Sequence, residues 1–393
     1  MSRIVVEQDG VKRRTSGSFF RGSTTNFYPN DQSLKKNYAI DQYMTHGFMP
    51  KSGFVTKSTP IVAFGSCFAA NISNYLHDRG FNILTKKASK AYVTQMGDGM
   101  VHTYAIRQQF EWAWLNKTPS LDLWHGYSAE EFGYSEAARA DTKELFDTAE
   151  VFVITLGLSE IWYDEPTGEV FWRAIPKDRY DPERHKFRVA THAETLANIK
   201  AIHELIRYFR PEATIIFTVS PIPLTATFRP VACLSANAVS KATIRSAVDE
   251  FMLETAPADD RLFYFPSYDI VMYAFNNQWT EDRRHVYRHI LNFNMKIFEH
   301  YYCDPALPKA DLQAALDKAQ RLDKLIGTLG HAAVAMKEKT EVEVEASPEA
   351  KREERRLQRK QARIQERVAQ RIAAVSARRA AARAEKATAV AAE

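Results

Sequence analysis

The residues best suited to catalysis stand where an apolar run ends. The segment "IVAFGSCFAAN" (61–71) predicts a buried strand that stops at Gly65 and passes directly into a helix, with Ser66 and Cys67 at the junction. A side chain there lies beside free backbone N–H groups at the positive end of the helix dipole. That setting favours a cysteine thiolate, whereas a serine needs a nearby base. We interpret Cys67 as the nucleophile and Ser66 as the helix cap, with a serine nucleophile or simple packing of small residues as alternatives.

A residue that could act as the base appears much later. In "WTEDRRHVY" (279–287), Asp282 and His285 are three positions apart, so one turn can bring them together. The carboxylate can then orient the imidazole while the other ring nitrogen faces a nucleophile. A surface turn with a solvated histidine is the alternative. The adjacent Arg284 could attract an anionic substrate or could be solvated.

Strands and helices alternate between these residues and must position them. The predicted strands are 60–65, 81–84, 150–157, 213–220 and 261–267, with 168–173 outside the main sheet. The predicted helices are 68–80, 104–115, 193–211, 237–256 and a helical pattern over 285–302. Short apolar strands separated by helices predict a mainly parallel sheet in a three-layer α/β/α sandwich. Ligands of such sheets bind at the carboxyl ends of the strands, here "GSC", "TLGLSE" and "TVSPIP".

The composition changes along the chain and predicts four regions. These are an N-terminal arm (1–57), the α/β domain (58–305), a helix with a charged linker (306–348) and a basic Ala/Arg-rich helical tail (349–393). Residues 351–386 hold thirteen Lys or Arg and four Glu, so this stretch carries +9 and the rest of the chain −4. We expect a solvated charged helix there. Weak self-association as a coiled coil, or contact with an anionic surface, is the alternative.

Several classes of protein are disfavoured. The sequence has no run of about 18 apolar residues and no apolar signal segment, so we expect no membrane span. Three scattered cysteines without a CxxC pair indicate a reducing compartment, and we expect a cytoplasmic protein. Phosphate-binding loops, dinucleotide fingerprints and clustered metal ligands are also absent from the sequence. We therefore expect no metal and no resident cofactor.

The order of a first-strand nucleophile and a late D-x-x-H resembles SGNH, or GDSL-type, hydrolases. More closely, "FGSCFAANI" resembles the signature of the GSCFA domain family, which is placed with the SGNH-like proteins. The segments "TYAIRQQFEWAW", "TLGLSEIWYDEPTGEVFWRAIP", "RHKFRVATHAETLANI" and "SPIPLTATFRPVACLSANAVSKA" are also similar to that family. The resemblance spans about residues 58–302 and implies an SGNH-like, flavodoxin-like sandwich.

The resemblance also implies roles for single residues. Cys67 takes the nucleophile's place, and Asp282 and His285 match the orienting acid and the base. The Gly-x-Asn-Asp block of SGNH enzymes corresponds to Gly157-Leu158-Ser159-Glu160, so Ser159 stands where an asparagine donates to the oxyanion. A hydroxyl can donate one hydrogen bond, but loss of a good oxyanion donor costs ~10²–10³ in rate.

Three further polar residues are candidates for substrate binding. Arg107 could bind a substrate anion or pair with a carboxylate. Glu160 could accept a hydrogen bond from His285 or a substrate hydroxyl, or pair with Arg173. Asn237 stands with Ser240 and Lys241 near a predicted helix start, where backbone N–H groups bind anions.

These expectations converge on acyl chemistry. We expect a hydrolase or acyltransferase that acts on an O-acylated small molecule or carbohydrate, with acyl-CoA as a candidate donor. The alternatives are a catalytically reduced protein that binds a sugar or nucleotide-sugar, and a scaffold that works through its basic C-terminal helix.

Overall fold

A computed structural model describes residues 3–8, 11–16, 25–87, 89–96, 99–125 and 129–332, the first two ranges as backbone only. The described residues up to Leu329 belong to one compact unit. The predicted basic tail (349–393), and the charged linker beyond residue 332, lie outside the described residues.

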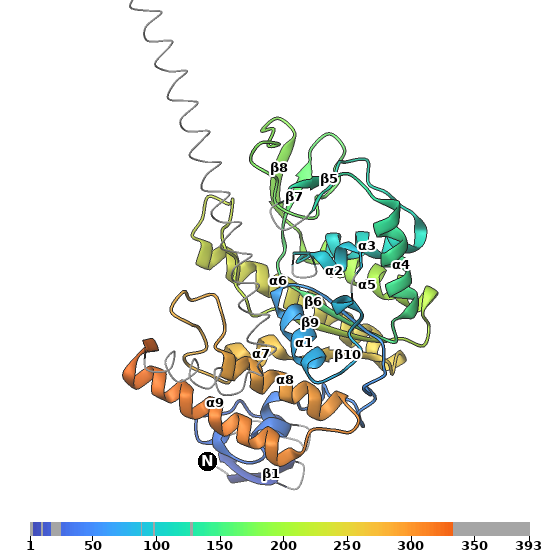
Figure 1. The fold of residues 1–393 in the computed structure, drawn as a ribbon. Coiled ribbons are helices and arrows are strands. Elements are labelled where there is room, and N and C mark those ends of the chain that lie inside the picture. The colour runs from blue at the N-terminus through green and yellow to red at the C-terminus, as the bar shows by residue number, and fades with distance from the viewer. Residues whose placement is uncertain are drawn as a thin grey trace, which may run out of the picture. The chain divides into compact units, whose positions relative to one another are not determined.

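Four parallel strands form the central sheet in the order β10–β9–β6–β3 (Figure 1). They are β3 (Ile61–Gly65), β6 (Val151–Leu156), β9 (Thr214–Val219) and β10 (Leu262–Phe265). All but one of their residues are buried, as expected for apolar strands covered on both faces. Gly65 pairs in register with Thr155, and Thr155 with Thr218, so the strands end together at one edge. The predicted parallel sheet is confirmed.

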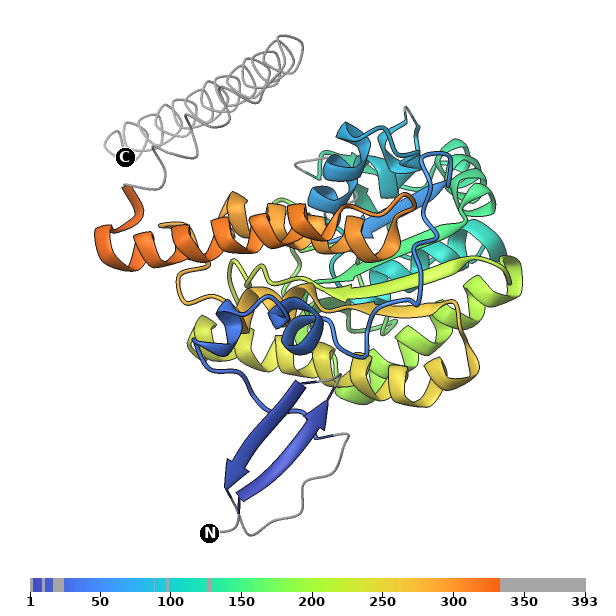
Figure 2. The same cartoon turned by 90° about the horizontal axis from the view of Figure 1, so that it is seen from below.

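Helices cover both faces of this sheet (Figure 1 and Figure 2). One layer holds α3 (Thr103–Leu115), α4 (Glu136–Thr148), α5 (His192–Phe209) and α6 (Cys233–Thr255). On the other face lie α1 (Cys67–Asp78) and α8 (Arg288–Tyr302), with α9 (Lys309–Leu329) packed on α8. Phe152 packs on Phe110 of the first layer, whereas Phe265 packs on Phe298 of the second. The three-layer α/β/α sandwich is therefore confirmed.

Smaller elements surround the sandwich. They are the helices α2 (Tyr92–Gln95) and α7 (Ser267–Tyr273) and three antiparallel pairs: β1 (Arg3–Gln8) with β2 (Val11–Ser16), β4 (Trp124–His125) with β5 (Glu131–Phe132), and β7 (Glu160–Asp164) with β8 (His185–Val189). The strand predicted over 81–84 is only one parallel bridge, Ile61 to Ile83, because Leu84 begins a 3₁₀ turn. Among the described residues, no helix is both long and apolar enough to cross a membrane.

The segment before β3 is joined to the end of the sandwich. The N–H groups of Phe54 and Val55 both donate to the carbonyl of Tyr302, over 2.9 and 2.8 Å. The Gln320 side chain of α9 donates to the carbonyl of Leu34 over 2.7 Å. Much of the predicted arm is thus part of the packed structure.

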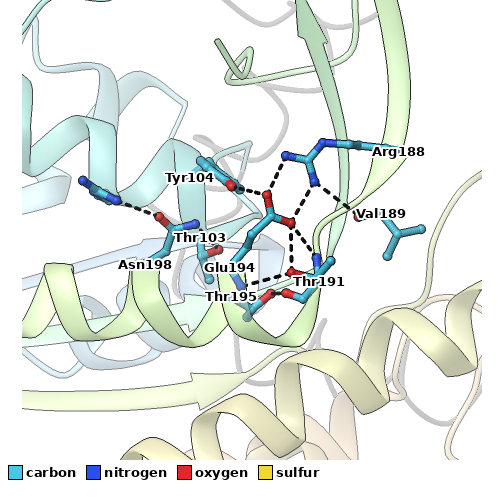
Figure 3. A network of polar contacts seen from close by, with 9 residues as sticks. Thr103, Tyr104, Arg188, Val189, Thr191, Glu194, Thr195 and Asn198 are labelled. Atoms are coloured by element: carbon cyan, nitrogen blue, oxygen red, sulfur yellow. Dashed lines mark hydrogen bonds and ion pairs between the residues drawn. The ribbon is translucent and has the colours of Figure 1, made fainter. Parts of the chain in front are cut away.

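A partly buried carboxylate network anchors the β7–β8 hairpin to the helical layer (Figure 3). Glu194, at the third position of α5, accepts two hydrogen bonds from Arg188 of β8, over 2.7 and 2.8 Å. Tyr104 of α3 donates to it over 2.8 Å, and the N–H of Thr191 over 2.8 Å, which completes a capping box. Asn198 connects α5 to Thr103 over 3.2 Å. Because β7 follows directly from the end of β6, this network fixes the hairpin beside the carboxyl edge of the sheet.

Candidate active site

The turn between β3 and α1 presents Cys67 to solvent. Gly65 has φ +131°, and a Cβ there would collide with the carbonyl oxygen of Thr155 on β6. Ser66 is the buried N-cap of α1, and its hydroxyl accepts the N–H of Phe68 at 3.2 Å, as predicted. Cys67 is the first residue of α1 and is exposed. Of the two candidate nucleophiles, the cysteine is thus the accessible one.

The turn after β6 lies against this nucleophile turn. The N–H groups of Gly157 and Leu158 donate to the carbonyl of Val101, over 2.7 and 3.1 Å. A Cβ on Gly157 would stand 3.4 Å from the Cβ of Ser66 and 2.9 Å from that of Val101, so only a glycine allows this close approach. The two turns therefore form one surface at the carboxyl edge.

The residue in the oxyanion-donor position uses its polar groups inside the fold. The N–H of Ser159 donates to the hydroxyl of Ser240 on α6 over 2.8 Å. The hydroxyl of Ser159 also lies 3.2 Å from that oxygen and donates to it. Ser159 and Ser240 are both buried. As the structure stands, the donors of Ser159 point into the helix layer and not toward a bound acyl group.

A lysine is buried between two strand ends at the same edge. Lys241 of α6 is 2% exposed, and its amine donates to the carbonyls of Gly157 and Ser220, over 2.6 and 2.7 Å. Burial lowers the pKa of this amine to about 7, while the charge of Cys67 acts to raise it. The sequence analysis grouped Lys241 with Asn237 and Ser240 near a helix start but did not predict the burial of its amine. The available signal was its place in a buried helical stripe with Ile244 and Val248.

Asp282 and His285 form a hydrogen-bonded pair between α7 and α8. The Asp282 Oδ2 contacts the His285 Nδ1, and Oδ1 accepts the N–H groups of His285 and Arg284 over 3.0 and 2.9 Å. These backbone donors, together with the imidazole and the Thr280 hydroxyl, hold the pKa of the Asp282 carboxyl below its usual range. The turn is closed by Arg283 at φ +57°. The His285 side chain is 65% exposed, so a substrate can reach the imidazole.

The packing of α8 places this pair at the same edge as Cys67. Tyr75, near the end of α1, donates to Glu299, near the end of α8, over 2.7 Å. Arg79 also pairs with Glu299 over 3.2 Å. Phe298 packs on Phe265, the last residue of β10, and Tyr302, one turn later in α8, also reaches Phe263, so α8 runs toward the amino ends of the strands. Like α1, α8 therefore begins at the carboxyl edge of the sheet. Cys67 and the loop that carries His285 therefore belong to one end of the molecule.

The other predicted binding residues have partners within the fold. Arg107 forms an ion pair with Glu111 over 2.8 Å, which is the carboxylate-pairing alternative. Glu160 accepts a hydrogen bond from Thr227 over 2.8 Å, and burial raises the pKa of its carboxyl. The side-chain oxygen of Asn237 accepts the N–H of Leu224 over 3.1 Å and so orders the loop before α6.

Arg284 differs from these three residues. Its Nε is buried and has no hydrogen-bond partner in the part of the chain that the structure describes. Across the same described ranges, no group of three or more His, Cys, Asp or Glu side chains could hold a metal ion.

Comparison with known families identifies the family of the α/β domain. The GSCFA family model matches residues 60–298, which is more than half of the chain. The chain belongs to the GSCFA family. The matched region of this GSCFA protein contains the Cys67 turn, Lys241 and the Asp282–His285 pair. A search of curated proteins finds no match.

Proposed function

We propose that this GSCFA protein is an SGNH-like hydrolase or acyltransferase that uses Cys67 as its nucleophile. The observation that carries this proposal is the exposure of Cys67 at the first residue of α1, on the same edge of the sheet as the Asp282–His285 pair. A nucleophile, a base and a group that orients the base are the three parts that covalent acyl transfer requires. The substrate class is an O-acylated small molecule or carbohydrate.

The proposed reaction has two steps, acylation of Cys67 and deacylation. In the first, the Cys67 sulfur attacks the acyl carbonyl, His285 takes the thiol proton and passes it to the leaving oxygen, and a thioester replaces the ester. In the second, water or an acceptor hydroxyl attacks the thioester, His285 takes the proton of this nucleophile, and the Cys67 thiol is restored. Asp282 holds the Nδ1 side of the imidazole throughout, which leaves Nε2 for proton transfer.

The Arg284 side chain is suited to recognise an anionic donor. Its buried Nε lacks a protein partner among the described residues, and its backbone adjoins His285. A guanidinium binds phosphate and carboxylate oxygens well, so acyl-CoA remains the candidate donor in the acyltransferase form of the proposal.

One observation favours a second candidate, a sugar- or nucleotide-sugar-binding protein with little turnover. The donors of Ser159, Gly157 and Leu158 are all engaged inside the fold. An acyl oxyanion would have to find its stabilisation elsewhere, and the loss of one such donor typically costs ~10²–10³ in rate. Slow or absent turnover is the expected property of this second candidate.

Intact-mass spectrometry distinguishes the two candidates. The protein is incubated with acetyl-CoA or p-nitrophenyl acetate, as wild type and as Cys67→Ala, Ser66→Ala, His285→Ala and the control Cys233→Ala. We expect an added acetyl group that requires Cys67 and His285 but neither Ser66 nor Cys233. An adduct lost only in Ser66→Ala makes the serine the nucleophile. Absence of any adduct, with the variants folded, supports the binding protein.

Two further features belong to the proposal. We place the protein in the cytoplasm, because Cys67, Cys233 and Cys303 form no disulfide within the described residues. We assign residues 349–386 to weak self-association or contact with an anionic surface, separate from the acyl chemistry. Deletion of residues 340–393 is expected to leave adduct formation unchanged. Loss of the adduct in a folded deletion variant would assign the tail to the reaction.

A further inference from the structure

The buried amine of Lys241 lacks a carboxylate to balance its charge. Its nitrogen bonds two carbonyl oxygens, those of Gly157 and Ser220, and no ion pair to it occurs within the described residues. Lysines are seldom buried this completely unless a negative group pairs with them. Two carbonyls use two N–H groups, so the ammonium form keeps a third N–H for another acceptor. The amine therefore lacks a counter-ion in a place where one is expected.

The nucleophile turn is the neighbour that can supply this negative charge. Gly157, which accepts from Lys241, packs against Ser66, the residue before Cys67. Burial lowers the pKa of Lys241, and the charge of Cys67 opposes this shift. Coupling between two titrating groups is reciprocal, so the charge of Lys241 must favour ionisation of Cys67 by the same free energy. The start of α1 acts in the same direction, because the helix dipole favours a thiolate there.

We propose that the ammonium group of Lys241 stabilises the thiolate form of Cys67. This inference rests on the proposed function for the use of that thiolate, and it adds a positioning charge that the Asp282–His285 pair does not provide. The proton that leaves the sulfur goes to His285 or to solvent, and the ammonium group keeps its own three protons. The two residues thus have different roles: His285 transfers protons, and Lys241 balances the negative charge on the Cys67 sulfur.

Alkylation with iodoacetamide, followed site by site with peptide mass spectrometry, tests this proposal. The reagent is neutral and reacts with thiolates, so its rate reports the ionised fraction of each cysteine. Cys233 is a matched control, because it is also the first residue of a helix. Cys303 is fully buried and reports unfolding. The variants are Lys241→Met and the control Lys200→Met, which removes an exposed lysine paired with Glu254.

At pH 6, where the Lys241 amine with its pKa of about 7 is mostly protonated, we expect Lys241→Met to alkylate at Cys67 about tenfold more slowly than the wild type, since an opposite charge nearby typically changes ionisation by this order. Cys233 is expected to react unchanged and Cys303 to remain protected. Lys200→Met is expected to match the wild type at all three cysteines. An unchanged Cys67 rate in Lys241→Met, with Cys303 protected, overturns the proposal.

A second variant covers the case in which Lys241→Met exposes Cys303. Lys241→Gln keeps an amide donor for one strand-end carbonyl but carries no charge, and the same slowing of Cys67 is expected. The wild type gives an independent test over pH 5.5–9, where Cys67 should stay reactive at lower pH than Cys233. Coincident profiles for the two cysteines overturn the proposal. Alkylation needs no acyl donor, so slowed Cys67 labelling without any acyl adduct keeps this inference and removes the proposed function.

Discussion

Replacing Glu194 by glutamine tests the network that anchors the β7–β8 hairpin. The carboxylate accepts two hydrogen bonds from Arg188, one from Tyr104 and one from the N–H of Thr191. Glutamine keeps the shape and one acceptor oxygen but removes the negative charge and places an NH₂ group among donors. The charge-assisted bonds to Arg188 are the strongest that the substitution loses.

The pKa of Glu194 gives the magnitude. Hydrogen bonds from the Arg188 guanidinium lower it from the ordinary 4.5 to about 2, which corresponds to about 3 kcal/mol. Because 30% of the side chain is exposed, solvent screens part of this interaction, and we expect a loss of about 1.5 kcal/mol at pH 7. The pKa is lower in the folded state, so this stabilisation is present above pH 4.5 and disappears as the pH falls through 2.

Urea unfolding at pH 7, 4.5 and 3 measures this effect. The control is Glu204→Gln, an exposed glutamate on the same helix, which is expected to change stability by less than about 0.5 kcal/mol. The difference between wild type and Glu194→Gln should shrink as the pH falls from 4.5 toward 2. A difference that is equal at pH 7 and pH 3, or equal to that of Glu204→Gln, would refute the reasoning.

Three other predictions concern residues near the site. Burial lowers the pKa of the helix-capping His102 from 6.5 to about 4, so the free energy of unfolding should fall by about 3 kcal/mol as the pH drops from 6.5 to 4. His102→Asn should remove this pH-dependent loss in urea unfolding. An equal loss in the variant would contradict the prediction. Gly65→Ala should destabilise the folded protein by at least about 2 kcal/mol, because the added Cβ would clash with Thr155. Gly80→Ala should cost less, because φ is also positive there but the space around it is open. Equal shifts in the melting temperature of the two variants would show that the clash is unimportant. Arg107→Met should lower the free energy of unfolding by no more than about 1 kcal/mol, because the ion pair with Glu111 is partly exposed. The variant should still form the acyl adduct. A folded variant without the adduct would make this arginine a substrate ligand.

The central sheet could be predicted because each strand is a short apolar run followed by small or polar residues. Burial on both faces makes these strands nearly continuous apolar runs, interrupted only by threonines such as Thr155 and Thr218, and this pattern is visible in the sequence. The cap at Ser66 and the pairing of Asp282 with His285 depend only on neighbours within three residues, so local spacing was sufficient for both.

The contacts that sequence reasoning missed join residues that are distant along the chain. The burial of Lys241 requires α6 to lie against the ends of β6 and β9, whose carbonyls are 84 and 21 residues away. The partner of Ser159 is likewise 81 residues away. The β1–β2 hairpin was expected only as an irregular arm, because its six-residue strands lack a clear apolar alternation. The contacts of Lys241 and Ser159 are fixed by tertiary packing and not by local propensity.

The attachment of the N-terminal segment has a practical consequence for shortening the protein. The family match ends at residue 298, yet the backbone of Phe54 and Val55 bonds Tyr302, and α9 holds Leu34. A fragment limited to residues 60–298 would lack Tyr302 and would expose the aromatic rings of Phe263 and Phe265, which pack on it. Such an exposed apolar surface promotes aggregation. A version for crystallisation or enzymology is therefore expected to need at least residues 34–329, which extends beyond the matched 60–298 at both ends.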